Sequence, residues 1–121
     1  MIQGIGVDLT ETKRIQKLMQ RQPRLTERIL TERERNVLSR YTNENRRLEF
    51  IAGRFAAKEA YSKAAGCGIG KDVSFQSIEL LSNGTGRPII YINGVYSQHV
   101  HVSISHSDHY VIAQVIIEET S

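Results

Sequence analysis

The segment 52–64 constrains the fold of this chain more than any other part. Its small and apolar residues recur at the spacing of one helical face, which predicts a long helix packed against the rest of the protein. Glu59 and Lys63 interrupt this face four residues apart and point the same way. Because burying a lone charge is costly, we expect both to have partners. An exposed structural pair would contribute only about 0.2–0.5 kcal/mol, a weak reason to interrupt an apolar face.

A further carboxylate, Asp8, is predicted at the end of the first strand. Ile5, Val7 and Leu9 alternate along a strand expected over residues 2–9. The other face of this strand carries glycines and then Asp8, so we expect open space beside the carboxylate. Two carboxylates from separate elements, a lysine and open space predict a magnesium and phosphate site. The alternative is that Asp8 merely caps the next helix.

The 121 residues favour one domain, residues 1–121, with a modest core. No apolar run reaches about 18 residues, so we expect no membrane-spanning helix. The N-terminus also lacks the pattern of a signal peptide, because acidic residues appear early. Cys67 is the only cysteine, which excludes an intrachain disulfide and fits a reducing cytoplasm.

Capping and breaking residues divide the first half of the chain into helices. Thr10 is suited to cap the first, which should end near Pro23 because residues before proline avoid the helical region. Thr31 and Glu34 have the spacing of a capping box. Gly66 is suited to end the longest helix in a left-handed conformation. The expected helices span 10–22, 24–30, 31–39 and roughly 46–65.

The second half of the chain is predicted to form strands. The turn residues 83–86 should join two antiparallel strands, and the short connection 106–109 should join the last two as a hairpin. The segment 111–117 is apolar with little alternation, so we expect that strand to be covered on both faces. The expected strands span 75–81, 88–92, 100–105 and 110–118. A strand, then helices, then several strands favours an α+β domain.

Basic residues concentrate near the N-terminus although the net charge is only +3. On a helix, Arg14, Lys17 and Arg21 share one stripe, and an apolar stripe lies beside it. The basic stripe would attract nucleic acid or an acidic protein, unless it is simply a solvated face. The segment lacks interleaved aromatic residues, which weighs against nucleic-acid binding.

The histidines near the C-terminus raise another alternative, a zinc hydrolase with three imidazole ligands. His99 and His101 would share one strand face, with His106 and His109 close in sequence. In an unbroken strand, however, five residues place His106 on the face opposite His101. We therefore interpret His99, His101 and His109 as surface or structural residues.

Three segments carry a family resemblance: Gly-Ile-Gly-Val-Asp-Leu-Thr-Glu at 4–11, Gly-Arg-Phe-Ala-Ala-Lys-Glu-Ala-Tyr-Ser-Lys-Ala at 53–64, and Val-Ser-Ile-Ser-His-Ser at 102–107. In identity, order and spacing they resemble the 4'-phosphopantetheinyl transferases, specifically the short bacterial holo-acyl-carrier-protein synthase type. The resemblance covers essentially the whole chain. It implies the α+β fold of this family, with an antiparallel sheet packed against a long helix. It further implies a homotrimer with active sites at its subunit interfaces.

The implied activity is transfer of phosphopantetheine from coenzyme A to a serine of apo acyl carrier protein, supporting fatty acid biosynthesis. The other product would be adenosine 3',5'-bisphosphate. Asp8 and Glu59 match the family's magnesium ligands, and Lys63 and His106 match residues that contact phosphate. The general base is either Glu59 or a magnesium-bound water. We favour the water, because a carboxylate that binds a metal is a weak base.

The resemblance also suggests further binding residues. Arg54 would be a phosphate ligand, Gly66 would allow close backbone approach, and Ser107 would offer a hydroxyl donor. Members of the family commonly have Gly-Thr-Gly where this chain has Cys67 between glycines, which removes one possible hydroxyl contact.

The basic segment gains a partner from the same resemblance. Acyl carrier proteins are small and acidic, so electrostatic steering would speed their encounter with it. Arg14 and Arg21 fit the family's carrier-binding positions best. The expected carrier-binding residues are Arg14, Arg21, Arg24 and Arg28. We expect coenzyme A, the carrier and further copies of the chain as partners, and neither nucleic acid nor membrane.

Overall fold

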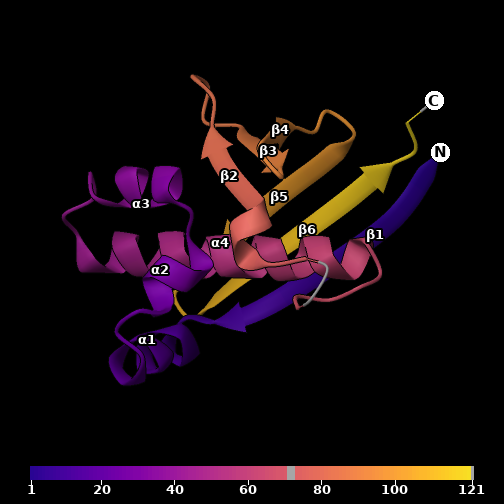
Figure 1. The fold of residues 1–121 in the computed structure, drawn as a ribbon. Coiled ribbons are helices and arrows are strands. Elements are labelled where there is room, and N and C mark those ends of the chain that lie inside the picture. Colours follow the sequence, from indigo (N-terminus) through magenta and orange to yellow (C-terminus); the bar gives the residue numbers. More distant parts are fainter. Residues whose placement is uncertain (71–72, 121) are drawn as a thin grey trace.

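The computed structural model describes residues 1–70 and 73–120. The elements follow one another as β1 (Ile2–Glu11), α1 (Thr12–Arg21), α2 (Leu25–Ile29), α3 (Glu32–Leu38), α4 (Glu44–Ala64), the 3₁₀ helix η1 (Phe75–Ser77), β2 (Ile78–Ser82), β3 (Pro88–Ile92), β4 (Val95–Tyr96), β5 (Val100–His106) and β6 (Tyr110–Glu118) (Figure 1). None of the helices in the described ranges is long and apolar enough to cross a membrane.

The described strands form two antiparallel three-stranded sheets. The larger sheet has the order β1-β6-β5, so the first and last strands are neighbours and both termini lie at one end of it (Figure 1). The smaller sheet has the order β2-β3-β4 and follows the chain. The fold is therefore α+β, as predicted.

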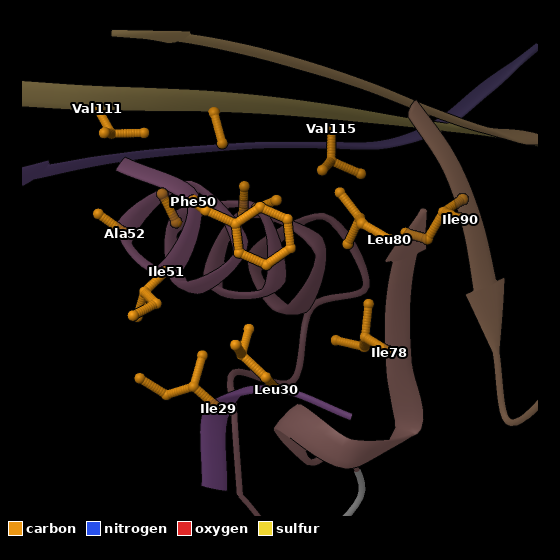
Figure 2. Packing of buried hydrophobic residues seen from close by; sticks show 14 of the residues in the cluster. Ile29, Leu30, Phe50, Ile51, Ala52, Ile78, Leu80, Ile90, Val111 and Val115 are labelled. Carbon is orange, nitrogen blue, oxygen red and sulfur yellow. The ribbon is translucent and has the colours of Figure 1, made fainter. Parts of the chain in front are cut away.

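Small residues let α4 lie across the larger sheet. Ala52, Ala56 and Ala60 are fully buried and belong to one core cluster with Val111 and Val115 of β6 (Figure 2). Short side chains permit close approach of a helix to a strand. This packing leaves Glu59 and Lys63 at the edge of the contact, where Lys63 reaches Asp8 of β1.

The core continues from α4 to the smaller sheet and the short helix α2. Ile29 and Leu30 at the end of α2 are fully buried in one cluster with Ile78, Leu80 and Ile90 (Figure 2). Burial of one such side chain typically stabilises by about 1.5–3 kcal/mol. The two sheets and α2 thus share one hydrophobic core around α4.

Several predicted helix ends are confirmed, and two are wrong. The capping box joins Thr31 and Glu34 at the start of α3, and Gly66 has a left-handed φ of 80° after α4. However, α4 begins earlier than predicted because the Asn43 side chain accepts a hydrogen bond from Arg46 N. Thr10 is no helix cap either, since it belongs to β1.

The predicted strand 75–81 begins three residues late. Ser74 and Ser77 cap each other's backbone, which folds Phe75–Ser77 into a 3₁₀ turn before β2 starts. The prediction also missed β4, which follows a tight turn at Asn93 and Gly94, where φ is 51° and 80°. Two consecutive residues with positive φ are typical of a hairpin turn.

The expectation that β6 is covered on both faces is wrong for the single chain. Its residues alternate between buried and exposed, and Ile112 is 43% exposed. On the neighbouring β1, Ile5, Val7 and Leu9 are 58%, 51% and 63% exposed. On the face of the larger sheet away from α4, the β1 and β6 part therefore exposes apolar side chains, while the β5 part exposes His101, Ser103 and Ser105. We call Ile5, Val7, Leu9 and Ile112 the outer apolar face.

Candidate active site

Glycines in β1 determine how closely this strand approaches α4. A Cβ atom at Gly6 would lie 1.9 Å from the carbonyl oxygen of Ala60, and one at Gly4 would lie 2.0 Å from that of Ala64. Only glycine permits such backbone contact. The expected open space is therefore filled by α4 itself. This packing places Asp8, on the same strand face, beside the charged residues of α4.

Both carboxylate oxygens of Asp8 accept hydrogen bonds. Lys63 Nζ donates to Asp8 Oδ1 at 3.0 Å and to the Val7 carbonyl at 3.1 Å. The Thr10 hydroxyl donates to Asp8 Oδ2 at 2.6 Å. Thr10 thus orients the carboxylate instead of capping α1. Since the Asp8 side chain is 14% exposed, these contacts hold it in a defined position at the surface.

Glu59 completes a cluster with Asp8 and Lys63. Burial raises the pKa of Glu59, and the negative charge of Asp8 raises it further, while Lys63 and Arg14 oppose the shift. The sequence placed Glu59 and Lys63 on a buried face, but they lie at its edge. Glu59 is half-buried and the Lys63 side chain is 52% exposed. Substrate therefore has access to both.

These donors fit a magnesium ion. Carboxylate oxygens are the hard ligands that magnesium prefers, and it needs only one or two of them beside water and phosphate oxygens. Burial contributes most to the raised pKa of Glu59 and the charge of Asp8 adds to it; a bound dication would offset both. Lys63 adds a positive charge on the accessible side, suited to a phosphate oxygen.

An aromatic contact connects this cluster to α1. The Arg14 guanidinium lies 5.9 Å from the centre of the Phe55 ring, and that ring lies 5.6 Å from Phe75. Arg14 also lines a groove of about 340 Å³ along α1, which has the lining residues Glu11, Arg14, Lys17, Leu18 and Arg21. A basic groove thus begins next to the carboxylates.

The four predicted carrier-binding arginines are exposed along this side of the chain. Arg14 and Arg21 lie on α1, where Ile15 packs into the core and the basic residues face outward. Arg24 and Arg28 lie just before and within α2. All four are thus exposed along α1 and α2, and Arg14 lies near the Asp8 cluster.

Arg54 and His106 line a different pocket, of about 340 Å³. Its wall includes Tyr41 and Phe50, and the Arg54 guanidinium lies 3.9 Å from the Phe50 ring centre. Burial lowers the pKa of Arg54, and Glu34 opposes the shift. Among the described residues, Arg54 Nε has no hydrogen-bond partner, so this buried cation retains a donor. An anion in the pocket could use it.

His106 and Asp8 lie on strands at opposite edges of the larger sheet. His106 ends β5, where its Nε2 lies 3.3 Å from a carboxylate oxygen of Glu49. Gly53 of α4 faces Ile104 on this side, whereas Ala60 faces Gly6 on the other. The structure therefore brings Asp8, Glu59 and Lys63 together but leaves Arg54 and His106 across α4.

Two further predicted residues have backbone roles. The Ser107 hydroxyl oxygen accepts from Tyr110 N at 3.2 Å and from His109 N at 3.4 Å, closing the β5–β6 hairpin. Gly66 donates its N–H to the Lys63 carbonyl at 3.0 Å and directs the chain away from α4. Both lie near the predicted site residues Lys63 and His106 in sequence, and each shapes a turn there.

The zinc alternative lacks a ligand group. No three His, Cys, Asp or Glu side chains in the described ranges are grouped to hold a metal. His101 instead pairs with Glu118 across β5 and β6.

Sequence reasoning missed a buried ion pair between Lys58 and Glu34. Both side chains are fully buried, and Lys58 Nζ lies 2.6 Å from Glu34 Oε1. Burial lowers the pKa of Lys58, and Glu34 opposes the shift. The capping box already explained Glu34 in the sequence, and nothing there indicated that Glu34 also pairs with Lys58. Lys58 lies next to Glu59 in a helix with buried residues on most of its surface.

Comparisons with known sequences agree with these motifs. A family model described as the 4'-phosphopantetheinyl transferase superfamily matches residues 4–115. A holo-(acyl-carrier-protein) synthase of Staphylococcus aureus (strain Newman) is 50% identical over 121 residues, covering 100% of this chain and 99% of the relative. One from Anoxybacillus flavithermus is 53% identical with the same coverage.

Solved structures show the same fold. A holo-(acyl-carrier-protein) synthase from Bacillus anthracis in complex with CoA (3',5'-ADP) gives a TM-score of 0.88 at 50% identity, covering 99% of each chain. The Helicobacter pylori enzyme in complex with coenzyme A gives 0.79 at 31% identity, covering 94% of this chain and 99% of the other. By sequence and fold, this chain belongs to the 4'-phosphopantetheinyl transferase superfamily, among its holo-(acyl-carrier-protein) synthases.

Proposed function

We propose that this protein transfers the 4'-phosphopantetheine group of coenzyme A to a serine hydroxyl of apo acyl carrier protein. The products are holo acyl carrier protein, for use in fatty acid biosynthesis, and adenosine 3',5'-bisphosphate. The observation that carries the proposal is the cluster of Asp8, Glu59 and Lys63 in a chain that is 50% identical to holo-(acyl-carrier-protein) synthases over its full length. Residues 1–121 act as one domain, in the cytoplasm, where the exposed thiol of Cys67 stays reduced.

Asp8 and Glu59 would hold a magnesium ion. The ion would offset charge that develops on the pyrophosphate as its bond breaks. Thr10 and Lys63 keep the Asp8 carboxylate oriented through the hydrogen bonds to its two oxygens. Lys63 can turn its exposed ammonium toward a phosphate oxygen. As a metal ligand Glu59 would be a weak base, so a water beside it is favoured as the acceptor of the serine proton.

The nucleotide part of coenzyme A would bind the pocket of Arg54 and His106. Arg54 Nε is a buried donor without a partner among the described residues, and His106 lines the pocket at the end of β5, next to Ser107. Gly66 and the glycines after it allow close backbone approach on the Lys63 side. Since one chain holds the two groups on opposite sides of α4, a complete site requires the Asp8 cluster of one copy and the pocket of another.

The chain would assemble into a homotrimer with three such shared sites. The outer apolar face supports this, because its exposed aliphatic side chains need cover. The basic surface of α1 and α2, with Arg14, Arg21, Arg24 and Arg28, would dock the acidic carrier beside the site.

Intact-mass spectrometry of an apo acyl carrier protein tests the proposed reaction. Incubation with this protein, coenzyme A and magnesium should add one phosphopantetheinyl group, and EDTA should prevent the addition. A carrier whose target serine is replaced by alanine is the control for the site of modification. Absence of the mass increase on a competent carrier would overturn the proposal.

A further inference from the structure

The short helix α2 carries part of the proposed carrier-docking surface, and its position depends on contacts with the rest of the protein. It has five residues, Leu25–Ile29, and a helix this short is unstable without outside contacts. Arg24 and Arg28 project from it into solvent. On its other side, Ile29 and Leu30 anchor it in the core next to Ile51 (Figure 2).

The last carbonyl groups of a helix lack partners within it and must find them elsewhere. At the end of α2, the two N–H groups of Gln76 Nε2 lie 2.8 Å from the carbonyl oxygens of Glu27 and Leu30, with that of Arg28 at 3.2 Å. Arg35 Nη1 of α3 also donates to the carbonyls of Leu30 at 2.7 Å and Glu27 at 3.4 Å. The remaining carbonyl, of Ile29, accepts from Lys58 Nζ at 2.7 Å. Side chains from η1, α3 and α4 thus occupy four successive carbonyls.

Lys58 extends this arrangement into α4 and α3. Its ammonium also donates to the Phe75 carbonyl at 3.0 Å and to Glu34 Oε1 at 2.6 Å. Glu34 in turn accepts from Leu80 N at 2.9 Å through its other oxygen. A buried ion pair adds little stability compared with apolar residues of the same volume. Its clear effect here is geometric, because it joins α2, α3, η1 and β2 to the helix that carries Glu59.

We propose that Gln76 and Lys58 form a clamp that fixes α2 relative to α4, and that Gln76 is thereby a positioning residue for carrier docking. Gln76 touches neither the Asp8 cluster nor the Arg54 pocket; it acts through Arg24 and Arg28. A fixed docking surface binds the carrier with a smaller entropy cost, which lowers the carrier KM. The inference rests on the proposed function, since it takes α2 as part of the carrier-docking surface.

The first test is hydrogen exchange in segment 24–31, which needs no substrate. Gln76→Met removes the donors at similar size and should speed exchange there. Gln76→Lys keeps a donor and should retain slow exchange. Gln98→Met, at an exposed glutamine in the turn before β5, is the matched control and should leave segment 24–31 unchanged. Unchanged exchange in Gln76→Met would overturn the clamp.

The second test is steady-state kinetics. Gln76→Met should raise the carrier KM about three- to tenfold, the usual effect of losing hydrogen bonds of this kind, with kcat and the coenzyme A KM unchanged. In an Arg24→Ala, Arg28→Ala background the same substitution should add nothing. Faster exchange with an unchanged carrier KM would overturn the positioning role. If the wild-type protein transfers nothing, the proposed function fails, while hydrogen exchange still decides whether the clamp exists.

Discussion

Contacts between β1 and α4 hold Asp8 and Glu59 near each other. Thr10 and Lys63 fix Asp8, and packing of α4 on β1 fixes Glu59. Burial, and then the charge of Asp8, raise the pKa of Glu59, and a cation bound by both carboxylates would offset these effects. Folding alone therefore places the two carboxylates, before any ligand binds.

Replacing Asp8 or Glu59 with alanine should lower kcat at least about 10²-fold, because each change removes a carboxylate that organises charge at the phosphate. The transfer rate with saturating coenzyme A and carrier measures this. Circular dichroism melts should show an intact fold. Glu119→Ala, at an exposed carboxylate near the C-terminus, is the control and should keep full activity. Near-normal turnover in Asp8→Ala would mean that the metal assignment is wrong.

Glu59 should also make stability depend on pH in the absence of divalent cations. Its native pKa is raised above the ordinary value of 4.5, so the native state binds more protons between the two values. Stability attributable to Glu59 therefore falls as pH rises through that interval. Glu59→Gln should be more stable than the wild type at pH 7, by less than about 1 kcal/mol because the side chain is half-exposed.

Thermal melts in EDTA across a pH series measure this difference, which should vanish near or below pH ~4. A wild-type protein more stable than Glu59→Gln at pH 7 would show that Lys63 and Arg14 outweigh burial and Asp8.

Among elements, the contact of β1 with α4 decides where the carboxylates lie. Gly6 has no room for a side chain against the Ala60 carbonyl, whereas a Cβ at Gly53, on the same helix, would meet Ile104 Cγ2 at an ordinary 3.6 Å. The two glycines therefore differ in purpose. One is required by packing, and the other is tolerated in a helix.

Gly6→Ala should destabilise the protein by about 3 kcal/mol or more, because rigid backbone blocks the new methyl group. Gly53→Ala, the matched control, should be neutral or stabilising by up to about 1 kcal/mol, since alanine is the better helix former. Urea unfolding measures both. A stable Gly6→Ala variant would contradict the close packing of the strand on the helix.

The helix α1 presents its basic stripe beside the carboxylates. Arg14→Glu with Arg21→Glu should raise the carrier KM at least about tenfold and leave the coenzyme A KM little changed, because charge reversal opposes an acidic partner. Arg40→Glu, at an exposed arginine that does not line the α1 groove, is the control for net charge. Equal effects on both KM values would show that α1 is not the carrier dock.

For the whole molecule, the main consequence of the fold is that one chain separates two sets of predicted site residues. Asp8, Glu59 and Lys63 lie on one side of α4, and Arg54 and His106 lie on the other. The outer apolar face meanwhile lacks cover in the single chain. Assembly of several copies would bring the two sets of residues together between chains and would cover the outer apolar face.

Mixing two inactive variants tests shared sites directly. Asp8→Asn and Arg54→Ala should each be inactive alone, and subunit exchange at equal ratio should restore about a quarter of the sites by random pairing of intact halves. Transfer activity after mixing measures it.

Val7→Lys places a charge on the outer apolar face and should convert the trimer to monomers, as measured by light scattering. A stable, active monomer would contradict the assembly.

Local chemistry was sufficient to predict many elements. The capping box of α3, the left-handed Gly66 and the hairpin joining β5 to β6 depend on residues within a few positions of one another. Neighbouring side chains and allowed φ angles decide such features, so they can be predicted from a short stretch of sequence. The α+β class followed from their order.

Features that depend on distant partners were mispredicted or missed. The periodicity of α4 indicated an apolar face, but the contact with β1 decided that Glu59 and Lys63 lie at its edge while Lys58 is buried. The glycines of β1 led us to expect open space, but in the structure the backbone of α4 occupies it. Sequence motifs supplied the candidate site residues. Tertiary packing decided which of them meet in one chain, because burial and proximity depend on elements that lie far apart in the sequence.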